Sequence, residues 1–148
     1  MAYSDIEQYT LDLNIFFKDN KKIIHIASGG GKLPVVLLSS DRYNDTFEKK
    51  LMQLPPKFNI KINPKLSNML KLKDEELAIY LSDFIEVAKR GIYSYDKTQL
   101  GDYDNMEFHL VAKPIQKRKI KVDDTKLIKV NTVLTDEFEI FNLENIDI

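Results

Sequence analysis

The segment DEELAIYLSDFIEVAKRG, residues 74–91, carries every sequence signal of one amphipathic helix. Asp74 is suited to the N-cap position, and two glutamates follow it in the first turn, where carboxylates stabilise the positive end of the helix dipole. A Lys-Arg pair occupies the last turn, and Gly91 is suited to a left-handed stop. We therefore predict a helix over residues 74–90 that packs across a sheet. Its apolar stripe has helical spacing: Leu77, Leu81, Phe84 and Ala88.

The composition predicts one soluble domain over residues 1–148. The 22 basic and 23 acidic residues nearly cancel, so no global charge favours DNA, RNA or an anionic membrane. The absence of cysteine excludes disulfides and thiol nucleophiles. We find no secretory signal, and no apolar run approaches the roughly 20 residues that span a bilayer. We therefore expect a cytoplasmic protein.

Alternating apolar residues predict most of the sheet. Residues 9–17 alternate in this way, and a tight turn at 18–21 leads to a returning strand at 23–27, which together make an N-terminal hairpin. The fold class that follows is α+β, with a mainly antiparallel sheet, one long amphipathic helix on a face and one or two shorter helices. The other expected strands are 58–62, 106–112 and a C-terminal meander of 119–122, 127–134 and 138–143. The shorter helices are expected near 35–40 and 45–53.

The run Ser28-Gly29-Gly30-Gly31-Lys32 holds three of the five glycines of the chain. Residues without Cβ can turn their N–H groups inward around an anion, and Lys32 would add positive charge. The run is not a Walker motif, because Lys32 is followed by leucine and no glycine stands at the required earlier position. The alternative is a sharp chain turn at the exit of the hairpin.

The residues after the 74–90 helix form a second candidate site. Tyr95, Asp96 and Lys97 bring together a phenol, a carboxylate and an ammonium, which suit a small polar ligand. Tyr93, Tyr95 and Tyr103 are candidate anchors of an interaction surface. The alternative is that Tyr93 and Tyr95 alternate on a short edge strand that ends in a turn at residues 96–97.

Motifs of catalysis and metal binding are missing from the sequence. His25 and His109 each lie between apolar residues, without the paired spacing of a zinc site. No GxSxG segment is present. Residues 102–105 alternate oxygen-bearing side chains but lack the rest of a calcium loop, so we interpret them as a solvated loop. We therefore assign no catalytic residue, metal or cofactor.

Charge is unevenly distributed near the C-terminus. Residues 113–129 contain seven basic side chains, whereas residues 136–148 contain five acidic ones and no basic one. We expect neighbouring strands with complementary charges. Nucleic-acid binding by residues 117–121 is a weaker hypothesis, which predicts a steep salt dependence.

Two functional hypotheses follow. The first is a small intracellular interaction protein that binds a protein partner or a second copy, of the kind of bacterial accessory or immunity proteins. The alternative is an enzyme or sensor for a phosphorylated or carboxylated small molecule, with Gly29–Lys32 as the anion cradle. Tyr95, Asp96, Lys97 or a histidine would close that site. Convergence of these groups on one pocket would favour the alternative.

Overall fold

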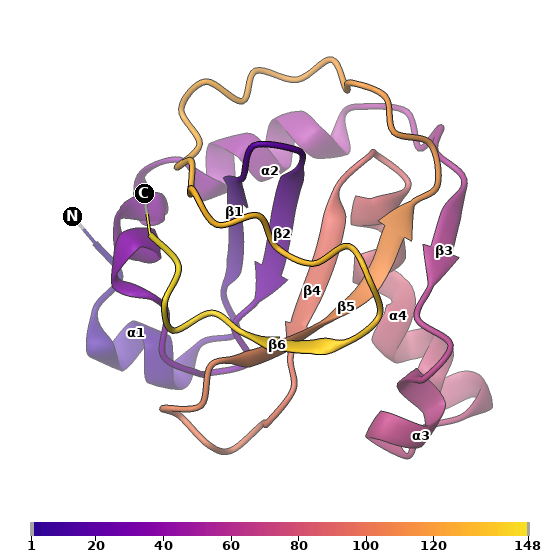
Figure 1. The fold of residues 1–148 in the computed structure, drawn as a ribbon, viewed down its shortest axis with the longest axis horizontal. Helices are drawn as coiled ribbons and strands as arrows, with labels where there is room; N and C mark the ends of the chain where they lie inside the picture. The colour runs from indigo at the N-terminus through magenta and orange to yellow at the C-terminus, as the bar shows by residue number, and fades with distance from the viewer. Residues whose placement is uncertain (1, 148) are drawn as a thin grey trace.

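The structure, a computed structural model, describes residues 2–147 and contains one mixed sheet of six strands (Figure 1). The strand order is β1-β2-β4-β5-β3, and β6 also pairs with β5. The strands are β1 (Asn14–Lys18), β2 (Ile23–Ala27), β3 (Ile60–Ile62), β4 (Tyr93–Lys97), β5 (Glu107–Pro114) and β6 (Ile140–Asn142).

The prediction of a mainly antiparallel sheet was wrong, because β2 and β4 pair in parallel at its centre. The chain between them is long enough to cross back over the sheet and enter β4 in the same direction as β2. The N-terminal hairpin of β1 and β2 is antiparallel, as expected. Sequence alternation identifies strands but does not say which strands become neighbours.

Five helices accompany the sheet. They are α1 (Asp5–Thr10), the 3₁₀ helix η1 (Val35–Arg42), α2 (Asn44–Met52), α3 (Leu66–Leu70) and α4 (Asp74–Ala88). We expected one long helix and one or two shorter ones. Instead, α4 has 15 residues, which is an ordinary length, and four other helices form. None of the helices in the described part of the chain is long and apolar enough to cross a bilayer.

The ends of α4 differ in how well they match the sequence prediction. Lys73 holds the N-cap position without a side-chain cap, and Asp74 has a positive φ of 53°. The predicted capping role of Asp74 is therefore not found. Past the other end, Gly91 has a φ of 99°, a conformation that favours glycine.

The strand predicted at residues 9–17 forms only in its second half. Ser4 and Glu7 make a reciprocal capping box, in which each side chain accepts a hydrogen bond from the other residue's backbone N–H. This cap begins α1, so Tyr9 lies on a helix rather than in the sheet. Residues 9 and 10 end α1 and residues 11–13 form a loop, so the apolar alternation of residues 9–13 does not mark a strand.

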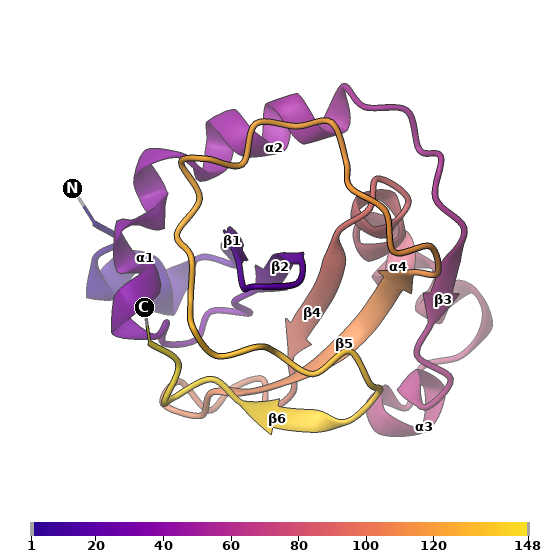
Figure 2. The same cartoon turned by 45° about the horizontal axis from the view of Figure 1, so that its top comes forward.

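The C-terminal meander is replaced by a long loop, residues 115–139, followed by the short strand β6. Figure 2 shows this loop encircling the turn between β1 and β2. Its backbone bonds to the sheet are few: Lys18 donates to the Ile128 carbonyl and accepts from the Val130 N–H, which makes one isolated bridge. The paired charged strands expected here do not form.

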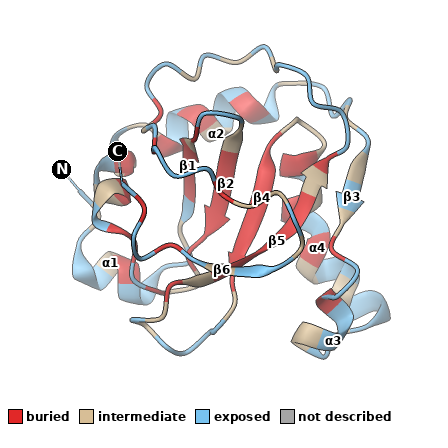
Figure 3. Ribbon diagram, viewed as in Figure 1, coloured by how far each residue is buried: buried red, intermediate tan, exposed pale blue. Residues whose placement is uncertain are grey.

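The sheet buries both faces (Figure 3). One face packs on the loop and on η1, through a cluster that includes Phe17, Ile26 and Leu110. The other face is covered by α4, through Leu81, Phe84 and Ala88. The predicted apolar stripe of α4 is therefore the surface that contacts β4 and β5.

One buried carboxylate joins the β1–β2 turn to the loop. The Asp19 side chain is 0% exposed and accepts four hydrogen bonds. The donors are the backbone N–H groups of Lys21, Lys22 and Leu134, at 2.8, 2.9 and 3.0 Å, and the Lys22 ammonium at 2.8 Å. Lys22 also donates to the Leu134 carbonyl. Asp19 and Lys22 thus both bond to the backbone of Leu134 and hold the loop at this residue.

We expect Asp19→Asn to lower the free energy of unfolding by about 3–5 kcal/mol, because it leaves the Lys22 ammonium buried without a counter-charge. Urea unfolding measures this loss. Asp124→Asn is the matched control, because Asp124 pairs with Lys18 at 3.6 Å in a more exposed position, where such a pair contributes about 0–1 kcal/mol. Equal losses in both variants would contradict the anchoring role of Asp19.

Candidate functional site

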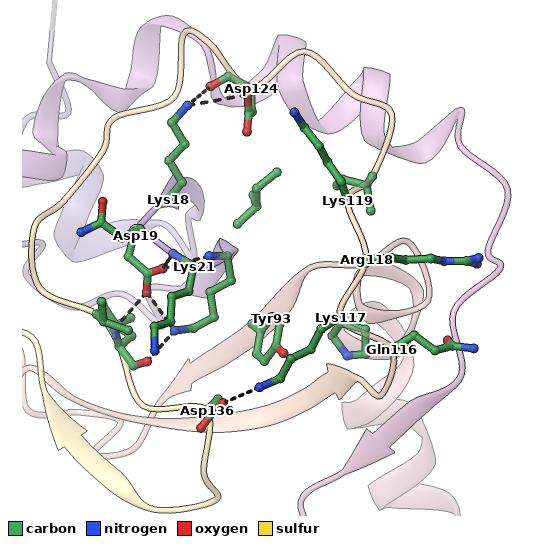
Figure 4. A pocket seen from close by; sticks show the side chains of 18 of the residues that line it. Lys18, Asp19, Lys21, Tyr93, Gln116, Lys117, Arg118, Lys119, Asp124 and Asp136 are labelled. Atoms are coloured by element: carbon green, nitrogen blue, oxygen red, sulfur yellow. Dashed lines mark hydrogen bonds and ion pairs between the residues drawn. The ribbon is translucent and has the colours of Figure 1, made fainter.

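The larger of two described cavities, of about 820 Å³, lies between the β1–β2 turn and the 115–139 loop (Figure 4). We call it the basic pocket, since six cationic side chains line it against three carboxylates. Its volume is within the range of small-molecule sites. The charged lining residues are Lys18, Asp19, Lys21, Lys22, Lys117, Arg118, Lys119, Asp124 and Asp136.

Each carboxylate of the basic pocket already has a lysine partner. The pairs are Lys22–Asp19 at 2.8 Å, Lys18–Asp124 at 3.6 Å and Lys117–Asp136 at 3.8 Å. Of the remaining cations, Arg118 points away from the cavity and stacks on the Phe58 ring at 4.9 Å. Within residues 2–147, no ion pair involves Lys21 or Lys119. The pocket therefore has an excess of positive charge.

Apolar side chains also line the basic pocket. Ile23, Ile120 and Val133 contribute aliphatic surface, and Tyr93 lies largely buried with the Lys22 ammonium 5.7 Å from its ring centroid. A bare inorganic ion would leave this apolar lining unused. The combination of apolar lining and excess cations suits an organic anion.

The glycine run lies past the far end of β2, away from the basic pocket. Gly29 and Gly30 have positive φ values of 58° and 71°. The N–H of Gly29 donates to Asp12 at 2.9 Å, that of Gly31 donates to the Ser28 carbonyl at 3.0 Å, and Lys32 N–H donates to the Tyr103 carbonyl at 2.9 Å. These bonds consume donors that an anion would need, which favours the alternative of a sharp chain turn.

Lys97 explains the third glycine of the run. A Cβ on Gly31 would lie 2.6 Å from the Lys97 Nζ, so a larger residue there would displace this side chain. Lys97 is 2% exposed and donates to the Asn105 carbonyl. Burial lowers the pKa of its ammonium. The structure thus brings Lys97 and the glycine run together, as a packing contact.

Asp96 belongs to a polar cluster beneath α4. The Tyr80 hydroxyl donates to Asp96 at 2.6 Å, and the Thr98 hydroxyl lies 2.8 Å from His109 Nδ1. Burial raises the pKa of Asp96 to about 6 and lowers that of His109 to about 4. Such pKa values suit acid–base chemistry. However, neither described cavity is lined by any of these four residues.

His25 has the partners of a catalytic histidine without the access. Its Nδ1 lies 2.7 Å from the Ser94 hydroxyl and its Nε2 lies 2.8 Å from Asn14 Oδ1. The ring also packs on Phe16 and Phe84, and burial lowers its pKa to about 3. Ser94 is fully buried and His25 is 2% exposed, so the hydroxyl and the ring are closed off from solvent. The triad holds strands β1, β2 and β4 together.

The three candidate interface tyrosines separate in the structure. Tyr93 and Tyr95 are buried, and the Tyr95 hydroxyl donates to the Thr135 carbonyl at 2.7 Å, where it supports the loop. Tyr103 is half-buried and lies in the β4–β5 loop next to Tyr9. The candidate residues therefore do not converge on one pocket.

Most residues of the basic pocket were not singled out from the sequence as a small-molecule site. Lys21 lay in a predicted turn, and residues 117–121 were considered only as a weaker candidate for nucleic-acid binding. The seven basic residues within 113–129 were the available signal. That signal was interpreted mainly as strand pairing, with nucleic-acid binding as the weaker hypothesis, because the loop path was unknown.

Comparison of the chain with protein-family models, with curated proteins and with solved structures gave no match. Within residues 2–147, no group of three or more His, Asp or Glu side chains is placed to hold a metal ion. Function is therefore inferred from the geometry of the residues themselves.

We predict that His25 makes stability depend on pH. Its folded-state pKa of about 3 lies below the ordinary 6.5, so the unfolded chain binds the extra proton as the pH falls between these values. The unfolding free energy of the wild type should therefore decrease relative to His25→Gln, by up to about 1.4 kcal/mol per pH unit below pH ~6. Urea unfolding at pH 7, 5.5 and 4.5 measures it. A difference that stays constant would show that His25 is not buried in neutral form.

Proposed function

We propose that this protein is a non-catalytic binding protein whose ligand is a small organic anion, phosphorylated or carboxylated, held in the basic pocket. The observation that carries the proposal is the excess of cations in a cavity of about 820 Å³. Lys21 and Lys119 line it without a carboxylate partner in the described part of the chain. An anion would supply the missing charge.

The electrostatic gain comes from where these lysines lie. Both residues line the cavity without a carboxylate partner, so an anion in the cavity would be attracted by each of these two positive charges. Lysine suits this role because its ammonium is a compact charge with three donors on a flexible stem. The paired lysines, such as Lys18 and Lys22, keep the loop in place instead.

Binding rather than catalysis is proposed because of what the lining offers. Neither histidine lines the basic pocket, and its three carboxylates are all paired with lysines. A general base needs a free acceptor close to the ligand. The pocket instead combines cations with an apolar wall, which provides affinity and orientation.

The proposal combines parts of both sequence hypotheses. It keeps the anionic ligand of the alternative hypothesis but assigns it to the β1–β2 turn and the 115–139 loop in place of Gly29–Lys32. It keeps the binding role of the first hypothesis without an enzymatic step.

We expect AMP or citrate to raise the melting temperature more than inorganic pyrophosphate, which leaves the apolar lining unused, whereas Lys21→Ala/Lys119→Ala should lose most of the shift. Ligand at 100 times its dissociation constant contributes about 2.7 kcal/mol, which amounts to roughly 5–11 °C in a domain of this size. Removal of one charge-assisted bond should weaken binding about tenfold, as measured by calorimetry.

Lys32→Ala is the matched control, since it removes an exposed lysine at the other end of the sheet. It should leave binding unchanged. Loss of binding in Lys32→Ala alone would move the site to the glycine run. No shift with any of the three anions would contradict the proposed function.

A further inference from the structure

A cluster of exposed apolar side chains lies at the end of the sheet opposite the basic pocket. Ile6 and Tyr9 on α1 are 75% and 68% exposed, and Leu100 in the β4–β5 loop is 65% exposed. Tyr103 in the same loop is half-buried. We call Ile6, Tyr9, Leu100 and Tyr103 the α1–loop patch. Single exposed apolar residues are common, so what matters is whether these four are contiguous.

One ring contact, the helical spacing of α1 and the glycine turn relate the members of the α1–loop patch. The Tyr9 and Tyr103 rings are 5.5 Å apart, and Ile6 lies one turn before Tyr9 on the same side of α1. The glycine turn lies beneath the other half. A Cβ on Gly29 would lie 2.7 Å from Leu100 Cδ2, and one on Gly30 would lie 3.2 Å from the Tyr9 carbonyl. A larger residue at position 29 would therefore displace Leu100.

Exposed carboxylates surround the α1–loop patch. They are Asp5, Asp12, Asp102 and Asp104, and within residues 2–147 none of them is in an ion pair. Asp5 precedes Ile6 on α1, and Asp102 and Asp104 flank Tyr103 in the β4–β5 loop. Burial, and then the charges of Asp5 and Asp104, raise the pKa of Tyr103. Two lysines lie nearby, but Lys97 is buried and only Lys32 is exposed. The rim is therefore acidic.

The two ends of the molecule thus have opposite character. The basic pocket is concave and cationic, whereas the α1–loop patch presents aromatic and aliphatic side chains within an acidic rim. Figure 1 shows the β1–β2 turn at the top of the sheet and the β4–β5 loop at the bottom. The small net charge of −1 conceals this separation.

We propose that the α1–loop patch is a docking surface for a basic segment of another protein. An apolar side chain of that segment packs against Tyr9 and Leu100, and its lysines or arginines face Asp102 and Asp104. Tyrosines are typical anchors at the centre of an interface, and complementary rim charges raise the association rate. This surface is separate from the basic pocket, so the two proposals stand or fall independently.

The test uses a labelled peptide that alternates Lys and Leu, with fluorescence anisotropy on the full chain. Two matched probes alternate Glu and Leu, or Lys and Ser. We expect measurable binding of the Lys-Leu peptide alone, weakened at least about tenfold by Tyr9→Ser. Asp102→Asn/Asp104→Asn should weaken it about fivefold and reduce its salt dependence.

Ile79→Ser is the control variant, because Ile79 is 72% exposed on α4, away from the α1–loop patch. It should bind the Lys-Leu peptide like the wild type, with circular dichroism confirming the fold of each variant. Equal binding of the Glu-Leu peptide, equal weakening by Ile79→Ser, or no binding at all would overturn the proposal. Self-association seen by sedimentation and lost in Tyr9→Ser would also overturn it, because the occupant would then be a second copy.

Discussion

The buried carboxylate of Asp19 is the constraint on which the shape of the molecule most depends. A buried carboxylate needs hydrogen-bond donors and a counter-charge. Asp19 obtains them from Lys21 and Lys22 in the β1–β2 turn and from the Leu134 N–H. Because Leu134 is distant in sequence, Asp19 helps to fix where the 115–139 loop passes, together with the bonds of Lys18 to Ile128 and Val130 and of Tyr95 to Thr135. The cavity beneath the loop exists because the loop is held there.

The same arrangement explains why basic side chains surround one cavity of the molecule. The loop carries Lys117, Arg118 and Lys119 past a turn that already holds Lys18, Lys21 and Lys22. Three lysines are neutralised by carboxylates that fix the loop, and the rest leave the cavity positive. At the other end of the sheet, the short loops carry aspartates and apolar residues. Charge separation across the molecule thus follows from where the loops are anchored.

Sequence periodicity identified the elements whose pattern is local. Residues 23–27 and 106–112 lie largely in strands, and 74–88 is helical, because alternation and helical spacing report directly on burial. It failed where a distant contact or a cap decides the structure. The Ser4 capping box begins a helix over residues 5–10, and the path of residues 115–139 is set by distant contacts such as those of Asp19, Lys18 and Tyr95 rather than by its own alternation. The candidate site residues lie far apart in the structure for the same reason, because the sequence pattern does not show which strands are neighbours.

The most direct test of the account is an amide NMR titration of the labelled protein with AMP. Binding in the basic pocket predicts the largest shift changes at the amides of Lys21, Lys119 and Leu134, with Gly29–Lys32 unchanged. Changes concentrated at Gly29–Lys32, or spread evenly over the exposed lysines, would contradict the central claim that the Asp19-anchored loop builds the ligand site.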